Sequence, residues 1–402
     1  MRSTAPDGHL PTLIACFAHF DVCFMLWVLV GALSGFIFVG SGIDAGLTGL
    51  IVGVPILTGS LLRIPLGLLS DRLGGRRVGL ALLLFLAAPL TIGWLAPGTL
   101  PVLIVTGLML GVAGSSFAIV LPLASRWYRA ERQGLVMGIA AAGNSGTVLA
   151  NLLAPRLATA VGWQNVFGLA LVPLGAVLIL FWAMAKDAPV RGTMRTTREY
   201  FAAVAHPDTW WFCFFYSVTF GGYVGLSSFL PVFLRDQFSV SPIAAGSLTA
   251  AAALAGSLSR PLGGYLADRL GGVLVLQRLL FAIAAAYVAL ALLTSLMTVV
   301  PVVMVAMVCL GFGNGVVFQL VPQRFQREIG SITGVVGAIG GIGGFLLPTL
   351  LGAVKQATGA YAPALVTLGV VAAAGGLSLR SLQSPTRAGS WRLPSLAGAD
   401  DF

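Results

Sequence analysis

Long apolar stretches separated by short polar breaks run along almost the whole chain. Each stretch holds about 20 residues or more, enough for a helix that crosses the roughly 30 Å hydrocarbon core of a bilayer. The alternation of apolar runs and polar breaks predicts twelve such spans. We expect them near residues 11–38, 45–70, 77–96, 100–123, 133–158, 164–186, 209–234, 242–268, 276–298, 300–322, 331–354 and 361–382. The pattern therefore predicts an all-α membrane protein.

Composition agrees with a protein embedded in lipid. Hydrophobic residues make up 57% of the chain and charged residues 9%, whereas a soluble domain carries about 25% charged residues. The mean hydropathy is +0.96. The net charge of +10 could suggest a nucleic-acid partner. However, the basic residues lie in short breaks between apolar spans, which is typical of cytoplasmic loops. We therefore expect the lipid bilayer as the surroundings and no nucleic acid.

The distribution of Lys and Arg predicts the orientation. Eighteen of them lie at the termini and in the even-numbered breaks, whereas the odd-numbered breaks hold three, namely Arg156, Arg235 and Lys355. Because positive residues gather on the cytoplasmic side, we expect a multi-pass protein of the cytoplasmic (inner) membrane with both termini in the cytoplasm. The two remaining basic residues, Arg63 and Arg260, lie inside apolar spans.

The polar breaks also divide the chain into domains. We expect an N-terminal six-helix bundle at 1–186, a cytoplasmic linker at 187–208, a C-terminal six-helix bundle at 209–383 and a disordered cytoplasmic tail at 384–402. The four cysteines lie in apolar spans without metal-ligand spacing, so we expect free thiols. The first apolar span is too long for a cleavable signal peptide. We expect no metal and no cofactor.

An internal repeat relates the two halves. Span 2 reads GSLLRIPLGLLSDRLGG from Gly59, and span 8 reads GSLSRPLGGYLADRLGG from Gly256, at a constant offset of 197 without a gap. Spans 5 and 11 share a weaker, glycine-rich echo. Two pseudo-symmetric six-helix halves, with a site near the middle of the membrane, are an architecture of secondary transporters.

The segment DRLGGRR, which begins at Asp71, resembles the signature of the major facilitator superfamily in the loop after span 2. This resemblance implies the major facilitator fold, with two six-helix bundles. It also implies a charge network at the helix ends that biases which side is open. The residues expected in that network are Asp71, Arg72 and Arg76, with Asp268 and Arg269 in the second half. The motif carries no information about the cargo.

Arg63 and Arg260 do carry such information. Each precedes the Asp at the end of its helix by eight residues, so about 12 Å of helix separates it from the loop. A charge at that depth costs about 2.5–3.5 kcal/mol and should face an interior cavity. The alternative is a structural pairing with acids or carbonyls, but Asp21 is the one acid placed deep enough in the other spans. The surplus of positive charge favours an anion, and the planar fork of arginine suits planar oxyanions such as nitrate, nitrite or carboxylate.

Glycine-rich segments occupy the middle of spans 5 and 11. Close approach of helix backbones would explain most of these glycines. We also expect Gly143, Gly146, Gly340 and Gly343 to provide smooth surfaces for movement between conformations. Asn144, within the first segment, needs polar partners in a dry interior, and a ligand would supply them.

Together these segments resemble the nitrate/nitrite porter family of the major facilitator superfamily. The resemblance covers all twelve spans and is strongest in FDVCFMLWVLVGAL, LLRIPLG, AGNSG, SRPLGG and GVVGAIGGIGGFLLP. It implies that arginines from both halves grip the anion, aided by an asparagine, a span 7 tyrosine and two rings that sandwich it. The matching substrate-binding residues are Arg63, Arg260, Asn144, Tyr216 (with Tyr223 as a less favoured candidate), Phe117 and Phe318. The chain departs from the family at Ala140 and Ala141, where members often have glycines.

The resulting hypothesis is a secondary transporter of nitrate and/or nitrite that works by alternating access, as a monomer. Proton symport and nitrate/nitrite exchange both remain open, as do the direction of transport and the preferred anion. Asp21, beside His19 in span 1, is the candidate for proton coupling, and a structural hydrogen bond is its alternative role.

Four rival interpretations have weaker support. A dicarboxylate exchanger would also need two cations but gives no reason for Asn144, and a drug exporter would need an acidic, aromatic cavity instead. A sensor built on a transporter fold lacks an added soluble domain in this sequence. An enzyme is not expected, because the sequence holds no metal-ligand cluster, nucleophile–base pair or phosphate-cradling loop.

Overall fold

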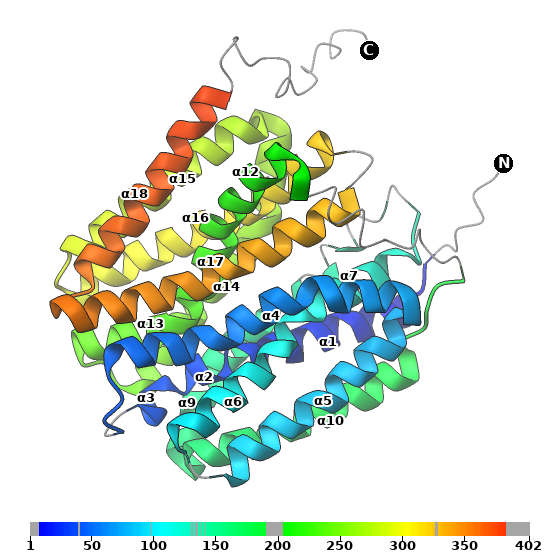
Figure 1. The fold of residues 1–402 in the computed structure, drawn as a ribbon, viewed down its shortest axis with the longest axis horizontal. Coiled ribbons are helices and arrows are strands. Elements are labelled where there is room, and N and C mark those ends of the chain that lie inside the picture. The colour runs from blue at the N-terminus through cyan, green and yellow to red at the C-terminus, as the bar shows by residue number, and fades with distance from the viewer. Residues whose placement is uncertain are drawn as a thin grey trace.

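The computed structural model describes residues 8–38, 41–96, 98–129, 132, 136–137, 139–140, 142–189, 204–325 and 329–382. Within these ranges every regular element is a helix (Figure 1). The first half contains α1 (Leu10–Trp27), α2 (Leu29–Ala32), α3 (Ser34–Ile37), α4 (Ala45–Leu73), α5 (Gly75–Leu95), α6 (Leu100–Gly111), η1 (Val112–Ser115), α7 (Ser116–Ser125), η2 (Ala142–Ser145), α9 (Gly146–Val161) and α10 (Trp163–Met184). The second half contains α12 (Pro207–Tyr216), η3 (Ser217–Gly221), α13 (Gly222–Phe238), α14 (Pro242–Leu270), α15 (Gly272–Leu292), α16 (Leu296–Arg324), α17 (Ile329–Thr358) and α18 (Ala362–Leu382).

The observed spans follow the sequence pattern closely, with two local differences. Eleven helices of the described part are long and apolar enough to cross a membrane, and the expected fifth span falls partly outside the described residues. The expected span 276–298 corresponds to α15, but its boundaries are displaced, because α15 ends at Leu292 and a break at 293–295 leads into α16. Only Thr294 and Ser295 mark this break in the sequence, and the expected span ran through them. The expected linker and tail lie largely or wholly outside the described residues.

The repeat in sequence is also a repeat in structure. Helices α4 and α14 each have 29 residues, and α5 and α15 each have 21. The turn after α4 and its counterpart after α14 place Gly74 at φ 93° and Gly271 at φ 88°. A side chain would strain both turns, which explains why glycine occupies the same place in both halves. The pseudo-symmetry predicted from the sequence is confirmed.

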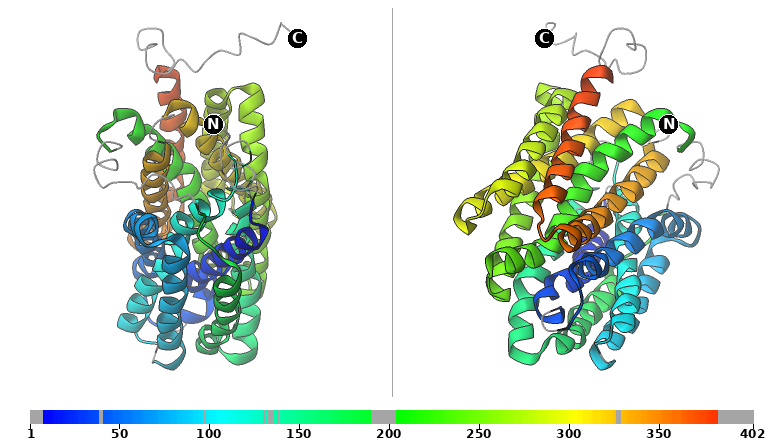
Figure 2. Two further views of the ribbon diagram at one scale, coloured as in Figure 1. Left: turned by 90° about the vertical axis from the view of Figure 1, so that its right-hand side faces the viewer. Right: turned by 60° about the vertical axis from the view of Figure 1, so that its left-hand side comes forward.

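The two halves meet chiefly along two helix pairs, α4 with α17 and α9 with α14, and α13 adds contacts with α2, α3 and α4 (Figures 1 and 2). We call the end of the molecule at which α1 begins and α18 ends the terminal end, and the opposite end the far end. Contacts between α4 and α17 run from the far end, where the Gly46 amide donates to Gln356 at 2.9 Å, to the middle, where Arg63 reaches the carbonyl of Gly337. Glycines at residues 49 and 352 allow the two backbones to touch near the far end. The halves are therefore packed together between the far end and the centre.

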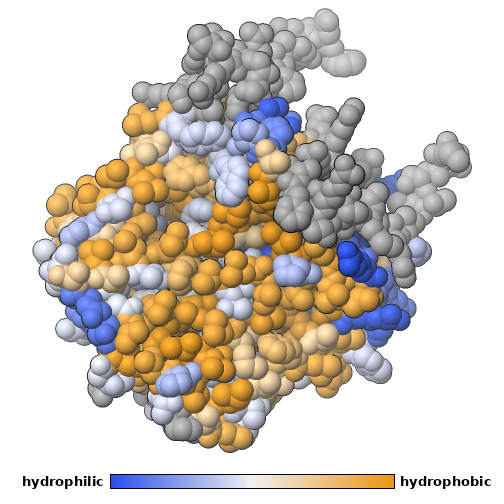
Figure 3. Space-filling view, in the orientation of Figure 1, coloured by the Kyte–Doolittle hydropathy of each residue, from blue (hydrophilic) through white to orange (hydrophobic). Residues whose placement is uncertain are grey.

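The outer surface is apolar between two polar ends (Figure 3). Large hydrophobic side chains are exposed there, including Val172 at 70% and Val370 at 60%. In water such a surface would drive aggregation, whereas acyl chains solvate it. The protein is therefore a multi-pass membrane protein.

Candidate anion-binding site

Arg63 lies on α4 in the middle of the interface between the halves and is 2% exposed. Its Nε donates to the Gly114 carbonyl of its own half at 3.1 Å, and its Nη1 donates to the Gly337 carbonyl of the other half. Its Nη2 is buried and has no hydrogen-bond partner among the described residues. The alternative role expected from the sequence, pairing with backbone carbonyls, thus applies to Nε and Nη1. The N–H groups of Nη2 stay available to an anion.

Aromatic rings from both halves surround this guanidinium. Its central carbon lies 5.4 Å from the ring centres of Trp27 and Phe117 and 5.0 Å from that of Phe220. Phe220 belongs to the second half, so the charge of Arg63 is held by rings on both sides of the interface. Cation–π contacts of this kind stabilise a buried charge without consuming its N–H donors.

Arg260 occupies the equivalent place on α14 and is partly exposed. Its guanidinium carbon lies 5.7 Å from the centre of the Phe318 ring. The Tyr216 hydroxyl lies within hydrogen-bonding reach of Arg260 and within electrostatic range of Arg63. The Tyr216 ring packs edge-on against Phe318, with centroids 4.7 Å apart and planes at 89°. The structure thus brings together five of the six predicted ligands: both arginines, both phenylalanines and Tyr216.

The two phenylalanines touch each other. The ring centroids of Phe117 and Phe318 are 6.2 Å apart and their planes are tilted by 53°. A flat anion between parallel rings needs about 7 Å, which is two layers of about 3.5 Å. The rings therefore meet across the interface in this conformation and would have to separate slightly to sandwich an anion.

Asn144, the sixth predicted ligand, lies beside this group. Its side-chain amide faces the other half, where Nδ2 lies 3.5 Å from the hydroxyl oxygen of Ser257. The Ser257 hydroxyl is 2.7 Å from the hydroxyl of Tyr223, which also lies 2.9 Å from the Ala253 carbonyl. The Asn144 Oδ1 is buried without a hydrogen-bond partner in the described part of the chain. Tyr223, the less favoured candidate, is thus joined to Asn144 through Ser257.

The site is built where three helices lose their regular α geometry. A 3₁₀ segment, η1, precedes Phe117, and another, η2, contains Asn144. A π-helical segment, η3, directly follows Tyr216 and contains Phe220. Such interruptions frequently occur at functional sites, because they redirect side chains and backbone groups. Hydropathy gave no signal for any of them.

Several contact residues were missed in the sequence. Phe220 and Trp27 carry no motif of their own. Ser60 and Ser257, in contrast, each precede an arginine by three residues, in GSLLR and GSLSR. Ser60 packs against Gly341, and Ser257 faces Asn144 at the matching position of the other half. Comparison of the two repeats would have identified this serine pair.

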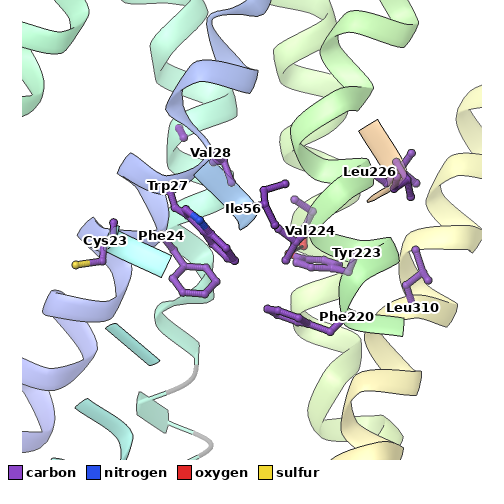
Figure 4. Close-up of a cluster of buried hydrophobic side chains, with 14 of the residues drawn as sticks. Cys23, Phe24, Trp27, Val28, Ile56, Phe220, Tyr223, Val224, Leu226 and Leu310 are labelled. Atoms are coloured by element: carbon purple, nitrogen blue, oxygen red, sulfur yellow. Dashed lines mark hydrogen bonds between the residues drawn. The ribbon is translucent and has the colours of Figure 1, made fainter. Parts of the chain in front are cut away.

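An apolar layer lies next to the site (Figure 4). Phe24, Trp27 and Ile56 of the first half point towards Phe220 and Val224 of the second. The Trp27 indole donates to the Pro55 carbonyl at 2.7 Å, which fixes the orientation of the ring. These side chains fill the space between the halves and exclude water from one side of the arginines.

The four predicted conformational glycines lie against helices of their own half. Gly143 and Gly146 contact the α1 backbone around Phe17 and Asp21. Gly340 contacts the ring of Tyr216 at the end of α12, and Gly343 contacts the backbone of Ser217. Close approach explains these glycines directly. Their part in conformational change stays a prediction.

The two candidates for proton coupling lie in different surroundings. His19 is fully buried in the first half, with Nδ1 2.8 Å from the Ser116 hydroxyl and Nε2 3.2 Å from the Gly79 carbonyl. Asp21 is half-buried and accepts a hydrogen bond of 2.6 Å from Ser145, which adjoins Asn144. Asp21 is therefore close to the site, whereas His19 is held within its own bundle.

Charged side chains at the terminal end pair within each half. Asp71 forms an ion pair with Arg126, and the Arg76 Nη2 donates to the Trp182 carbonyl at 2.7 Å. In the second half, Asp268 accepts from Gln319 at 2.7 Å. Arg269 lies over the ring of Tyr265, with its guanidinium carbon 4.6 Å from the ring centre, and Arg72 is exposed at the end of α4. The role of these residues in gating stays a prediction.

Comparisons with known proteins agree with this architecture. The sequence matches the family model of the Major Facilitator Superfamily over residues 15–389. Among solved structures, a bacterial homologue of the human lysosomal transporter Spinster superposes with a TM-score of 0.73 at 19% identity, covering 92% of this chain and 96% of that one. The human organic anion transporter MFSD10 superposes with a TM-score of 0.70 at 14% identity, covering 92% and 99%. At these identities the structural matches speak for the fold alone.

The chain therefore belongs to the Major Facilitator Superfamily of membrane transporters. It is 35% identical over 353 residues to the "Nitrite extrusion protein" of Bacillus subtilis (strain 168), which covers 87% of this chain and 89% of the relative. It is also 35% identical over 363 residues to the "Probable nitrate/nitrite transporter NarK2" of Mycobacterium tuberculosis (strain ATCC 25618 / H37Rv), covering 88% and 90%. Within the superfamily, the chain is thus a member of the nitrate/nitrite porter family.

Proposed function

We propose that the protein carries nitrate and nitrite across the inner membrane by alternating access. The observation that carries this proposal is the convergence of Arg63 and Arg260 from the two halves on Tyr216. Curated relatives named for nitrate or nitrite transport support the choice of anion. The buried, unpartnered Nη2 of Arg63 and Oδ1 of Asn144 are consistent with a small polar ligand that completes the site.

The terminal end is proposed to face the cytoplasm, as the distribution of basic residues predicts. The halves are packed between the far end and the centre, so this conformation would be the one that faces inward. In the proposed cycle the halves rock about the arginines and expose them first to one side and then to the other. A bound anion offsets the repulsion between two cations in a poorly screened interior, which favours movement of the loaded carrier.

The driving force is the finer part of the proposal. We propose nitrate uptake by proton symport, with Asp21 as the proton acceptor. This carboxylate accepts a hydrogen bond from Ser145, the residue next to Asn144. Nitrate/nitrite exchange is the second candidate, because repulsion between Arg63 and Arg260 would disfavour movement of the empty carrier. Proteoliposomes with an imposed pH gradient, or with internal nitrite, separate the two.

The test of the cargo is nitrate and nitrite uptake into proteoliposomes that contain the purified protein. Arg63→Lys and Arg260→Lys are the informative variants, because lysine keeps the charge but loses the planar fork. We expect uptake by the wild type and its loss in both variants. Absence of nitrate and nitrite uptake under either driving force would refute this assignment of the cargo.

A further inference from the structure

A cavity of about 300 Å³ lies between the two halves at the far end, well away from the arginines of the central site. Helix α3 and the start of α4 line one wall, with Ser34 and Thr48. The end of α13 and the turn before α18 line the other, with Arg235, Asp236 and Tyr361. The cavity opens to the surface beside Asp236, whose side chain is 44% exposed. Nothing in the central site uses this space.

Arg235 extends from the second half onto the first. Its side chain lies over Gly35, where an added Cβ would come within 2.9 Å of Nη1. This nitrogen is buried and has no hydrogen-bond partner among the described residues. Ser34 is 2% exposed, and its hydroxyl is likewise buried without a hydrogen-bond partner among the described residues. Since buried polar groups are normally satisfied, two unpartnered groups that line one cavity indicate a polar occupant.

The acidic residues near the cavity have other partners. Asp236 forms an ion pair of 3.1 Å with Lys355 and a hydrogen bond with Tyr361. Burial and the Asp236 carboxylate raise the pKa of Tyr361 far above its usual range, so that its hydroxyl stays protonated. Asp44 accepts from the Leu47 amide at 2.7 Å and thereby caps α4. None of these carboxylates supplies the missing acceptor of Arg235 within the described residues, so an external anion fits there.

Polar side chains of α13 lie between this cavity and the centre. Ser228 lies two turns closer to the site than Arg235, and its hydroxyl is buried and has no hydrogen-bond partner within the described chain. Ser227, beside it, lies within hydrogen-bonding reach of Tyr223. One further turn leads to Tyr223, which contacts Ser257 beside Asn144. Buried polar groups of α13 thus lie between the cavity and the central site, beside Val224 and Phe220, which face the first half.

We propose that this cavity is a second anion site, in which Arg235 and Ser34 hold nitrate or nitrite on its way between the far-end surface and the central arginines. The inference rests on the proposed function. It assigns Arg235 to capture of the anion at one face of the carrier. Substitution of Arg235 should therefore impair transport of nitrate that enters from the far end, and leave transport from the terminal end unchanged.

The test measures initial rates of nitrate transport in oriented proteoliposomes, with nitrate added to one face at a time. For Arg235→Gln we expect the KM at the far face to rise about tenfold, the scale of one lost hydrogen bond to a charged group. The KM at the terminal face should stay within twofold of the wild type. Gly35→Ala, which displaces the guanidinium but keeps its charge, should raise the same KM by a smaller factor.

Arg156→Gln is the matched control, because it removes one positive charge at the same end but outside the cavity. We expect an unchanged KM at both faces. An equal rise for Arg156→Gln and Arg235→Gln would show general attraction of anions by surface charge and would overturn the site. An unchanged far-face KM in a folded Arg235→Gln protein, checked by thermal unfolding, would also overturn it.

A binding measurement separates this inference from the proposed function. Calorimetric titration of Arg63→Lys with nitrate should keep a weak phase that disappears when Arg235→Gln is added. If the wild type transports neither nitrate nor nitrite, the carrier proposal fails, but this phase still reports on the cavity. If transport occurs and no phase depends on Arg235, the second site alone is wrong.

Discussion

Gly340→Ala should impair the site through a single neighbour, the ring of Tyr216. An added Cβ would overlap the ring at Cδ1 and lie 2.9 Å from Cγ and 3.1 Å from Cε1. Because unstrained carbon contacts begin at about 3.5 Å, the ring must retreat by up to about 1 Å. Tyr216 is stacked on Phe220 at 4.9 Å and meets Phe318 edge-on, so the retreat must displace the hydroxyl from Arg260.

The expected cost is one hydrogen bond to a charged ligand, about 1.5–3 kcal/mol, or about a 10- to 150-fold weaker affinity for nitrate. The assay is nitrate binding to the purified protein, followed by uptake into proteoliposomes. Gly175→Ala is the matched control, since a Cβ at this helical glycine meets nothing within 4 Å. We expect wild-type affinity there and a folded protein in both cases.

A double-mutant cycle tests the reasoning directly. If Gly340→Ala acts through the ring, it should have almost no further effect in a Tyr216→Leu background, where the clashing atoms are reduced. The coupling energy should then nearly equal the whole effect of Gly340→Ala. Full additivity of the two changes, or unaltered nitrate affinity in Gly340→Ala alone, would refute a role for the position of Tyr216.

Three further predictions address the neighbouring residues. Ser257→Ala should weaken nitrate binding, by less than Asn144→Ala does, because it removes only the group that orients the asparagine; an equal or larger loss in Ser257→Ala would contradict this order. Asp21→Asn should keep nitrate/nitrite exchange but abolish the acceleration of uptake by an inward pH gradient, and equal loss of both activities would argue against a proton role. Asp71→Asn should lower the stability by about 1–3 kcal/mol, because it leaves Arg126 without its carboxylate; thermal unfolding in detergent measures this, and an unchanged midpoint would show that the ion pair contributes nothing.

The fold could be predicted because the bilayer imposes a simple rule on sequence. A span needs about 20 apolar residues, and charged breaks mark its ends. Eleven of the twelve expected spans therefore match helices of the described part apart from boundaries, while the fifth lies partly outside it. The errors arose where this rule is silent. The break at 293–295 has only two polar residues, Thr294 and Ser295, too few to stand out between two long apolar runs. The breaks at Val28 and Leu33 within the first span change backbone geometry without changing hydropathy.

The part of the candidate site that could be predicted consists of charged and amide side chains within apolar spans. Arg63, Arg260 and Asn144 are costly in apolar spans and therefore stand out. Phe220 and Trp27 do not, because one more aromatic residue in a span is ordinary. Which carbonyls hold Arg63 could not be predicted either, since Gly114 and Gly337 are brought to it only by the packing of three helices.

The contacts of Arg63 suggest how anion binding and movement are linked in the proposed cycle. Its Nη1 bonds to the Gly337 carbonyl across the interface, and this bond must break when the halves separate from the far end. In an empty carrier the guanidinium would then lose a charged hydrogen bond, at a cost of about 1.5–3 kcal/mol. A bound anion offers a replacement acceptor and so lowers that cost. Since a ligand shifts a conformational equilibrium only by its differential affinity for the two states, this exchange of partners at Arg63 is a physical source of such a difference. The same argument assigns unequal tasks to the two related arginines, with Arg63 joining the halves and Arg260, partly exposed beside Tyr216, receiving the anion first.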